Sequence, residues 1–499
     1  SSAASDVYKR QVPYIPDEDY DNPAMVVDFY EFTMANCLFL HGFKDTTLVF
    51  DMFFRKNPDN MGYSISAGQR KLTRFLLNYH FNAQDIWWLR TKGMSEEFCE
   101  YLRTYKWKGD MYALPEGTVC YPHVQMVRIE CDLVGAILIE TYLLQTMNFH
   151  SLITTKATRV TGLNTHTPRS VMEFGTRRAQ GESAGNDGAY AAVLGGCIGT
   201  ACTITDELYG VPALGTMAHA WVQMFDTEYD AFKTYCELYP GNAIMLVDTY
   251  DTLHSGIPNA IRAFDEVLRP KGITKCGIRL DSGDIAYLSR KAREMLDEAG
   301  WETATITVSN SLDEYIIRDM WMQDAKIDSF GVGERLITAR SEPVFGCVYK
   351  LVAVEDKDGN VVPKIKISEN VGKITTPHFK KLYRFYGRDT GKAIADYLCV
   401  YDETVDDSDK MTIFDPEATW KRKEVYHFEA RELLVPIFKN GELVYKQPSL
   451  EEIRAYCAAQ VDTLWDEVKR FDNPHRYYVD LSQKLYDIKQ ELLTKNGSH

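Results

Sequence analysis

The first 140 residues alternate between helical and extended hydrophobic patterns. Apolar residues recur at helical spacing in 29–40, 72–79 and 96–104. The β-branched and aromatic run 46–53 is instead typical of a strand. Residues 131–148 are mostly apolar and predict one long buried helix. The pattern therefore predicts an N-terminal domain, residues 1–140, that mixes helices and strands.

Between residues 141 and 345, short apolar runs recur, and each ends in a polar or glycine-rich cluster. These runs with their clusters are 172–178, 211–220, 243–252, 276–284, 304–314 and 327–336. Four of the clusters are 29 to 31 residues apart, the length of one strand plus one crossover helix. Repeats of this length predict parallel strands, and more than four of them favour a closed or nearly closed α/β barrel. Spacing alone leaves an open doubly wound sheet as the alternative.

The pattern changes again after residue 345. Residues 347–354 and 361–368 flank Asp358-Gly359, which predicts a hairpin, and Asn440-Gly441 predicts a second one. Ser449–Glu452 has the sequence of a capping box and opens an amphipathic helix, and residues 481–493 predict a last helix. We therefore expect a small β-rich segment over 346–440 and, over 441–499, C-terminal helices that pack on the N-terminal domain.

Composition narrows the class of protein. The chain has 499 residues, 45% of them hydrophobic, and a net charge of −15. Such an acidic chain is a poor binder of nucleic acid or of anionic membranes, although local cations or Mg²⁺ still permit a phosphorylated small molecule. The eleven cysteines include no CxxC pair, which fits free thiols in a reducing compartment. With neither a signal peptide nor a membrane span in the pattern, we expect a cytoplasmic protein without nucleic-acid or membrane partners.

Polar side chains gather at the ends of the apolar runs in the middle region. In a parallel α/β barrel the carboxyl ends of the strands build the active site, so these side chains are candidates for one site. They are Phe174, Arg177, His219, Asp248, Arg279, Asp281, Asn310, Gly331 and Gly333. Carboxylates suit Mg²⁺ or sugar hydroxyls, arginines suit phosphate, and glycines allow close backbone approach.

Each candidate also has a structural interpretation. His219 is either a buried histidine satisfied by a neighbour or a base, metal ligand or phosphate acceptor. Helix capping explains Asp251, Ser282 and Asp284 well enough, whereas Asp248 and Asp281 come earlier, where the runs end. Those two carboxylates are therefore the better candidates for Mg²⁺ and ribose.

The glycine and arginine candidates are open to the same two interpretations. Gly331 and Gly333 precede a helical pattern, which fits either a phosphate-binding turn or a plain tight turn. Arg177 and Arg178 are adjacent and follow a strand-like run, so they bind phosphate or belong to a solvated surface.

Several of these strings together identify a resemblance. EFGTRRAQGESAGNDGAYAAVLGGCIGT, VPALGTMAHAWVQ, DTYDT, IRLDSGD and DSFGVG resemble nicotinate phosphoribosyltransferases, as do DFYEFTMAN, FDMFFRKNP and HRYYVDLS. The likeness runs in order from about residue 20 to residue 485. It implies a type II phosphoribosyltransferase with an irregular, TIM-like α/β barrel, an N-terminal α+β domain and a homodimer with shared active sites.

The resemblance also implies a reaction. Nicotinate and 5-phosphoribosyl-1-pyrophosphate give nicotinate mononucleotide and pyrophosphate, coupled to ATP hydrolysis with Mg²⁺, in the salvage of NAD. His219 matches the histidine that ATP phosphorylates in this family. Phe174 matches the aromatic residue that stacks on the pyridine ring, and Tyr30 matches a tyrosine that the partner subunit places on the other face.

Further positions match phosphate-binding and ribose-binding residues of the family. Those matching the 5′-phosphate cradle are Arg177, Gly331 and Gly333, with Ser309 and Asn310 alongside. Arg279 and Asp281 match a pair near the base and ribose, and Asp248 matches a carboxylate near the ribose and diphosphate. We expect Mg²⁺ to be bound through the diphosphate, with Asp248 or Asp281 as candidate protein ligands.

Two further basic residues match the family, and two positions differ from it. Arg55 and Lys350 match cations that face the diphosphate or ATP phosphates of the neighbouring chain. Glu334 stands where a neutral residue is expected, so the phosphate cradle differs in detail. Ala201 stands where nicotinamide-specific relatives have an aspartate, and its lack of charge favours nicotinate.

Three other functions stay open at this point. The first is a nicotinamide-specific phosphoribosyltransferase, which would prefer the amide over the acid. The second is a metal-dependent barrel hydrolase or aldolase that uses Asp248 and Asp281 and has no need of phosphoribosyl pyrophosphate. The third is a non-catalytic regulator that binds NAD metabolites, which any steady turnover excludes.

Overall fold

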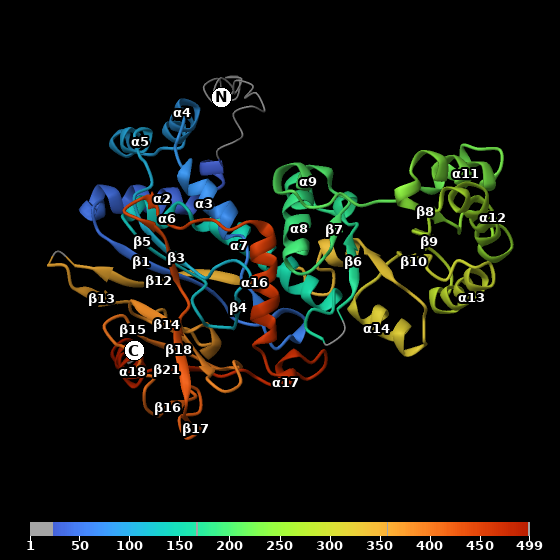
Figure 1. The fold of residues 1–499 in the computed structure, drawn as a ribbon. Coiled ribbons are helices and arrows are strands. Elements are labelled where there is room, and N and C mark those ends of the chain that lie inside the picture. The colour runs from blue at the N-terminus through green and yellow to red at the C-terminus, as the bar shows by residue number, and fades with distance from the viewer. Residues whose placement is uncertain (1–22, 166–167, 357, 498–499) are drawn as a thin grey trace.

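One large antiparallel sheet combines strands that come before the middle region with strands that come after it. The computed structural model describes residues 23–165, 168–356 and 358–497 (Figure 1). The sheet has the order β13-β12-β1-β5-β3-β19-β20. Its strands are β1 (Leu48–Phe54), β3 (Asp110–Ala113), β5 (Val127–Cys131), β12 (Cys347–Glu355), β13 (Val361–Pro363), β19 (Val435–Lys439) and β20 (Glu442–Leu443). Because β1 pairs with both β5 and β12, residues on either side of the middle region share one core.

Helices pack around this sheet in the N-terminal region. They are α2 (Phe29–Leu38), α3 (Gln69–Leu77), α4 (Ala83–Thr91), α5 (Glu96–Arg103), α6 (Leu133–Ile137) and α7 (Glu140–Val160). The prediction of one helix over 131–148 is wrong. Cys131 ends β5, and the Asp132 side chain accepts from the Gly135 amide and so starts a separate short helix. A continuous apolar run does not mark where a buried strand gives way to a buried helix.

A six-stranded parallel sheet forms the middle region, with the order β7-β6-β11-β10-β9-β8. Its strands are β6 (Ser170–Glu173), β7 (Gly199–Thr200), β8 (Ala243–Leu246), β9 (Cys276–Leu280), β10 (Thr305–Val308) and β11 (Ser329–Val332). β11 pairs with β6, as ring closure requires, but β7 and β8 do not pair within the described residues. The prediction of parallel strands is confirmed, but the sheet is a half-barrel, open between β7 and β8.

The opening lies where the sequence suggested another strand. Residues 211–220 make a single parallel bridge, between Thr200 and Ala213, and then lead into α10 (His219–Gln223). His219 is therefore the first residue of a short helix, and not the end of a strand. The other helices of this region are α8 (Glu182–Leu194), α9 (Thr203–Tyr209), α11 (Glu228–Leu238), α12 (Ile257–Ala263), α13 (Ile285–Glu298), α14 (Glu314–Met322) and α15 (Glu334–Ile337).

The C-terminal part contains a smaller sheet, β18-β14-β15-β21, and a separate hairpin. Its strands are β14 (Lys380–Gly387), β15 (Ala393–Val400), β18 (Phe428–Glu432) and β21 (Val479–Leu481), with the hairpin β16 (Met411–Phe414) and β17 (Arg422–Val425). Both predicted hairpins are confirmed, as β12–β13 and β19–β20, but they belong to the large sheet.

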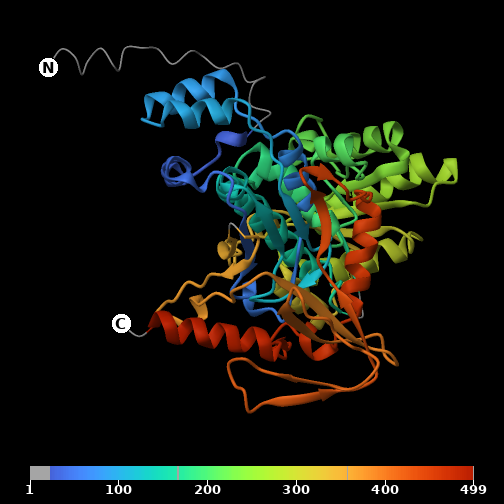
Figure 2. The same ribbon diagram turned by 90° about the vertical axis from the view of Figure 1, so that its left-hand side faces the viewer.

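C-terminal helices complete the fold. The predicted capping box opens α16 (Leu450–Asp462), which contacts both β4 (Val119–Cys120) and α8. α17 (Asp466–Lys469) follows it, and α18 (Gln483–Gly497) lies along the C-terminal strands (Figure 2). Among the residues that the structure describes, no helix combines the length and apolar character needed to cross a membrane.

Candidate active site at the ends of the parallel strands

His219, Asp248, Asp281, Arg279, Ser309 and Phe174 form one cluster at the ends of the parallel strands, called the His219 cluster below. Asp248 is its most deeply buried carboxylate. It follows β8 by two residues, and its side chain is 2% exposed. Oδ2 accepts from the Asp281 amide (3.0 Å) and from Ser282 Oγ (2.6 Å). Oδ1 is buried and has no hydrogen-bond partner among the described residues. The expectation that Ser282 is only a helix cap is wrong, whereas Asp251 and Asp284 do cap the helical turns that follow them.

His219 faces this carboxylate and a second one. Its Nδ1 lies 3.1 Å from Thr249 Oγ1, which fixes the orientation of the ring. Its Nε2 lies 4.0 Å from Asp248 Oδ1 and 3.8 Å from Asp281 Oδ2. The imidazole is 40% exposed, so Nε2 is accessible to a ligand that enters between the ring and the carboxylates.

Arg279 holds the end of β9 to its neighbours. Its Nε donates to Ser309 Oγ (2.9 Å), Nη1 to Thr216 Oγ1 (3.0 Å) and Nη2 to Asp281 Oδ1 (3.0 Å). Ser309 Oγ in turn donates to the same oxygen of Asp281. The guanidinium is thus fixed in place by its own strand end and by two other segments, which gives a pre-organised cationic surface at the mouth of the sheet.

Phe174 lies beside Arg279, with the guanidinium carbon 5.7 Å from the ring centroid. Glycines make room for the ring: a Cβ atom on Gly331 would lie 2.5 Å from Phe174 Cδ2. A Cβ atom on Gly333 would lie 2.9 Å from the Phe174 carbonyl oxygen. Both glycines therefore have a packing reason that is independent of phosphate binding.

These contacts bring most of the sequence candidates together. Gly331 and Gly333 contact Phe174, Phe174 lies beside Arg279, and Arg279 contacts Ser309 and Asp281 next to His219 and Asp248. Arg177, in the exposed turn Thr176–Arg178, and Asn310, exposed with a φ of 93°, adjoin the cluster in sequence. Within the described residues, neither of their side chains makes a hydrogen bond or ion pair with it.

Three candidates lie on the large antiparallel sheet and its helices instead. Tyr30 is 51% exposed on α2, and burial together with the charges of Glu140, Glu31 and Asp28 raises its pKa to about 12. Lys350 Nζ on β12 lies 3.8 Å from Glu140 Oε1, and Arg55 directly follows β1. No contact of the described residues joins them to His219.

The two departures from the family have local partners. Glu334 begins α15 and pairs with Arg340 at 3.4 Å. The backbone amide of Ala201 donates to the Glu173 carbonyl oxygen at 2.8 Å, just after β7. Residue 201 therefore lies at the end of β7, next to the end of β6 that carries Phe174.

Sequence reasoning missed Glu173, Thr216 and Thr249. Glu173 is fully buried; its Oε2 accepts from Thr200 Oγ1 (2.6 Å), and its Oε1 accepts from the Gly175 amide. Burial raises the pKa of this carboxyl. The sequence indicated a role for Glu173 only through its position directly before Phe174. Because the residues around it are apolar, the pattern predicted a buried strand and did not single out the carboxylate.

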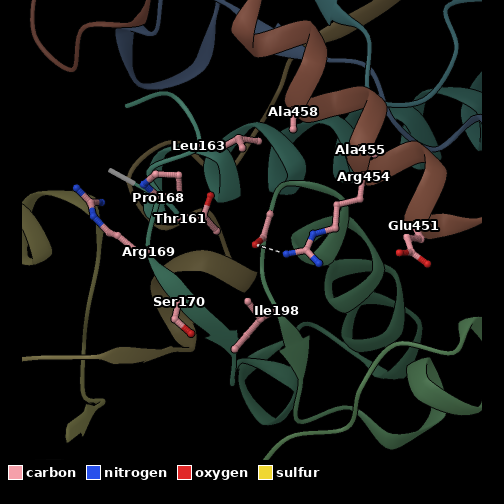
Figure 3. Close-up of a pocket in the computed structure, with 11 residues that line it drawn as sticks. Thr161, Leu163, Pro168, Arg169, Ser170, Ile198, Glu451, Arg454, Ala455 and Ala458 are labelled. Atoms are coloured by element: carbon pink, nitrogen blue, oxygen red, sulfur yellow. Dashed lines mark hydrogen bonds between the residues drawn. The ribbon is translucent and has the colours of Figure 1, made fainter. Parts of the chain in front are cut away.

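A cavity of about 540 Å³ lies at the other end of β6, where Ser170 begins the strand (Figure 3). Arg454 of α16 extends toward it and donates to the Gly196 carbonyl oxygen at 3.0 Å. Because Phe174 follows the opposite end of β6, this cavity is separate from the His219 cluster.

Comparison with known proteins gives the chain a family. Three family descriptions match it: nicotinate phosphoribosyltransferase N-terminal domain (residues 25–148), nicotinate phosphoribosyltransferase family (169–390) and nicotinate phosphoribosyltransferase C-terminal domain (379–489). The Bacillus subtilis nicotinate phosphoribosyltransferase is 42% identical over 94% of this chain and 95% of that protein. Nicotinate phosphoribosyltransferase 2 of Arabidopsis thaliana is 32% identical over 92% of each chain.

The fold agrees with this likeness. The crystal structure of human nicotinic acid phosphoribosyltransferase matches with a TM-score of 0.80 and 26% identity, over 94% of this chain and 99% of that one. The match extends over nearly the whole of both chains. The chain belongs to the nicotinate phosphoribosyltransferase family.

Proposed function

We propose that this protein transfers the phosphoribosyl group of 5-phosphoribosyl-1-pyrophosphate to nicotinate, coupled to ATP hydrolysis. The products are nicotinate mononucleotide and pyrophosphate, as in the salvage of NAD. The observation that carries the proposal is the pairing of Phe174 with Arg279, whose guanidinium is held by Thr216, Ser309 and Asp281. An aromatic face beside a fixed cation suits a flat heteroaromatic carboxylate.

The base would stack on Phe174 with its carboxylate toward Arg279. Nicotinate is already nucleophilic at its ring nitrogen, so the protein needs to orient it and not to deprotonate it. Ala201 near this face carries no charge that would repel a carboxylate. Tyr30 of the partner subunit would cover the other face of the ring.

Mg²⁺ fits the two carboxylates beside His219. Asp248 Oδ1 is buried without a hydrogen-bond partner, and Asp281 Oδ2 lies on the same side. Within the described residues, no set of three or more His, Cys, Asp or Glu side chains is arranged to hold a metal. That suits Mg²⁺, which typically takes one or two carboxylates and completes its shell with substrate phosphates and water. When bound, it would neutralise charge that develops on the departing diphosphate.

The remaining residues would bind the sugar and its phosphates. Displacement of pyrophosphate builds positive charge on the ribose, which Asp248 and Asp281 would stabilise. Arg177, Asn310 and the backbone at Gly331 and Gly333 would hold the 5′-phosphate. Arg55 and Lys350 would reach the diphosphate or ATP from the neighbouring subunit.

His219 would accept the γ-phosphoryl group of ATP at Nε2. The bond from the γ-phosphorus to the ADP oxygen breaks, a phosphorus–nitrogen bond forms, and water later releases orthophosphate. The phosphate adds about two negative charges near pH 7. Beside Asp248 and Asp281 it would draw in cationic groups and so tighten the binding of the diphosphate substrate.

This function implies a cytoplasmic homodimer with shared sites. Mixing Tyr30→Ala and Arg177→Ala variants tests the sharing, since a mixed dimer holds one intact site. Recovery of part of the activity is expected. If none returns although chain exchange is demonstrated, the shared site is excluded.

The direct experiment measures product mass after incubation with nicotinate, phosphoribosyl pyrophosphate and Mg²⁺, with and without ATP. Nicotinate mononucleotide is expected, and ATP should increase its yield. Arg279→Lys should reduce the preference for nicotinate over nicotinamide about tenfold, because a lysine cannot keep all the guanidinium contacts. Preference for the amide in the unmodified protein, or turnover without phosphoribosyl pyrophosphate, would contradict the proposal.

A further inference from the structure

Lys156 is a buried lysine at the centre of a network of charged side chains. It lies on α7, which packs against β12 of the large sheet and against α14 and α15 of the half-barrel. Its side chain is 4% exposed. Nζ donates to Asp59 Oδ2 (2.8 Å), Glu314 Oε1 (2.9 Å) and Ser341 Oγ (2.7 Å). All three N–H donors of the ammonium are therefore used, each by a different segment of the chain.

Arg159, one turn further along α7, extends this network. Its side chain is fully buried, with Nε 3.2 Å from Glu314 Oε1 and with Nη2 donating to Tyr315 Oη at 2.8 Å. Ser341 Oγ donates to Asp59 Oδ2 at 2.9 Å. Two cations thus face two carboxylates largely out of water. Loss of one member would leave an opposite charge unpaired, so the network holds its segments firmly together.

The segment 309–314 connects the His219 cluster to this network. At its start, Ser309 Oγ accepts from Arg279 Nε at 2.9 Å. At its end, Glu314 begins α14 and accepts from Lys156. Only a few residues separate the two contacts, so both ends of the segment are fixed by charged side chains of other elements.

The backbone between these two ends is strained. Asn310 has a φ of 93° and Ser311 has a φ of 48°. Left-handed backbone at residues other than glycine costs free energy and persists only where surrounding contacts hold it. The conformation that presents Asn310 therefore depends on the contacts of Ser309 and Glu314 on either side.

The segment that follows Gly333 is tied to the same lysine through Ser341. It includes Arg335, which donates to Asp313 Oδ2. The other oxygen of Asp313 caps α14 by accepting from the first backbone amides of that helix. The Gly333 segment and the Asn310 segment are therefore joined to each other directly, and both are joined to the network.

We propose that Lys156 is a positioning residue for the 5′-phosphate of phosphoribosyl pyrophosphate. Because the protein uses all of its donors, it acts through Glu314 and Ser341 and not by contact with the substrate. These two residues fix the segments that carry Asn310 and Gly333. The proposal rests on the proposed function, which assigns Asn310 and Gly333 to the phosphate.

The expected signature is a split between the two substrates. Lys156→Met should raise the KM for phosphoribosyl pyrophosphate about tenfold, because the two phosphate-binding segments lose their common anchor. The KM for nicotinate should change less than about twofold, since Phe174 and Arg279 would still hold the base. Lys326→Met is the matched control, because that lysine is 45% exposed and pairs with Asp324 alone on the surface at 2.8 Å. Both of its KM values should stay within about twofold of the unmodified protein.

Calorimetric binding separates this proposal from the proposed function. Phosphoribosyl pyrophosphate with Mg²⁺, and nicotinate, would be titrated separately into the full-length protein, so that no turnover is needed. If the unmodified protein does not bind phosphoribosyl pyrophosphate, the proposed function fails. If it binds and Lys156→Met binds with the same Kd, the positioning role is excluded. Equal weakening for both substrates, or a lower Tm with both Kd values unchanged, would show a purely structural role and overturn the proposal.

Ser341→Ala is a milder variant, measured because Lys156→Met leaves two buried carboxylates with one cation fewer. It removes one contact of the ammonium and keeps every charge of the network. The KM for phosphoribosyl pyrophosphate should rise about threefold, with the KM for nicotinate unchanged. Thr338→Ala is its control, since that hydroxyl donates to the Glu334 carbonyl oxygen one turn earlier at 2.7 Å. A folded Ser341→Ala protein with unchanged KM and Kd for phosphoribosyl pyrophosphate would overturn the proposal even if Lys156→Met fails to fold.

Discussion

The Nε2 atom of His219 lies 4.0 Å from Oδ1 of Asp248, a buried oxygen that accepts no hydrogen bond within the described residues. The other oxygen of this carboxylate is held by two donors, so Asp248 cannot turn away without losing both. A buried carboxylate oxygen without a partner carries a desolvation cost that a cation or a donor would relieve. The space between the two residues is therefore the best place in the site for a cationic or hydrogen-bonding group of the substrate complex.

Replacing Asp248 by Asn should lower kcat about 100-fold, because the site loses a negative charge aimed at the ribose and at Mg²⁺. The Mg²⁺ concentration for half-maximal rate should rise as well. Steady-state kinetics over a Mg²⁺ series would measure both. Asp251→Asn is the control, since Asp251 caps the next helical turn and pairs with the exposed His254 ring, away from Asp248. An unchanged Mg²⁺ dependence in Asp248→Asn would contradict the role in holding the ion.

Replacing His219 by Ala should abolish the stimulation by ATP and leave slow ATP-independent transfer. The reason is that Nε2 would be the phosphoryl acceptor, whereas Phe174, Arg279 and the carboxylates would still bind the substrates. Rates with and without ATP, together with phosphate release, would measure this. His254→Ala is the control, because that ring is 84% exposed. Full ATP stimulation in His219→Ala would refute the assigned role.

Replacing Glu173 by Gln should weaken the end of β6 without touching substrate. An amide presents a donor where the carboxylate accepts from Thr200 and Gly175, which costs about 1–3 kcal/mol. Because Phe174 follows directly, the KM for nicotinate should rise more than the KM for phosphoribosyl pyrophosphate. Glu182→Gln on the exposed start of α8 is the control. If the two KM values rise equally, Glu173 has only a general structural role.

Replacing Glu31 by Gln should increase stability at high pH only. Burial raises the pKa of Glu31 to about 7 from an ordinary 4.5, so the folded protein keeps its proton where the unfolded chain has lost it. Wild-type stability therefore falls as pH rises from 4.5 through 7. The variant lacks this loss, and its advantage should reach on the order of 1 kcal/mol above pH 7.

Thermal unfolding midpoints of wild type and Glu31→Gln at pH 4.5, 6 and 8 would measure this difference. The midpoint difference should grow with pH between the first and last condition. Glu97→Gln, at an exposed position of α5, should show no such trend. A constant difference across the series would show that Glu31 ionises normally in the fold.

Local sequence determined the short-range features correctly. The turns at Asp358-Gly359 and Asn440-Gly441 and the capping box at Ser449 depend on residues a few positions apart. A short stretch of sequence therefore contains every residue needed to predict them. The spacing near 30 residues likewise gave parallel strands, because one strand and one helix must fit in each repeat. The prediction of one helix over 131–148 failed because a strand and a helix are both apolar when they are buried on all sides.

Sequence by itself determined the family, the parallel strands and the identity of the clustered residues, because motifs and repeat lengths are properties of the chain. Tertiary structure alone decided that the ring opens between β7 and β8, that β12 and β19 join the N-terminal sheet, and that His219 begins a helix. It also decided the roles of Glu173 and Ser282, whose partners lie 27 and 34 residues away along the chain. Such contacts depend on how separate strands are placed against one another, which no local pattern encodes.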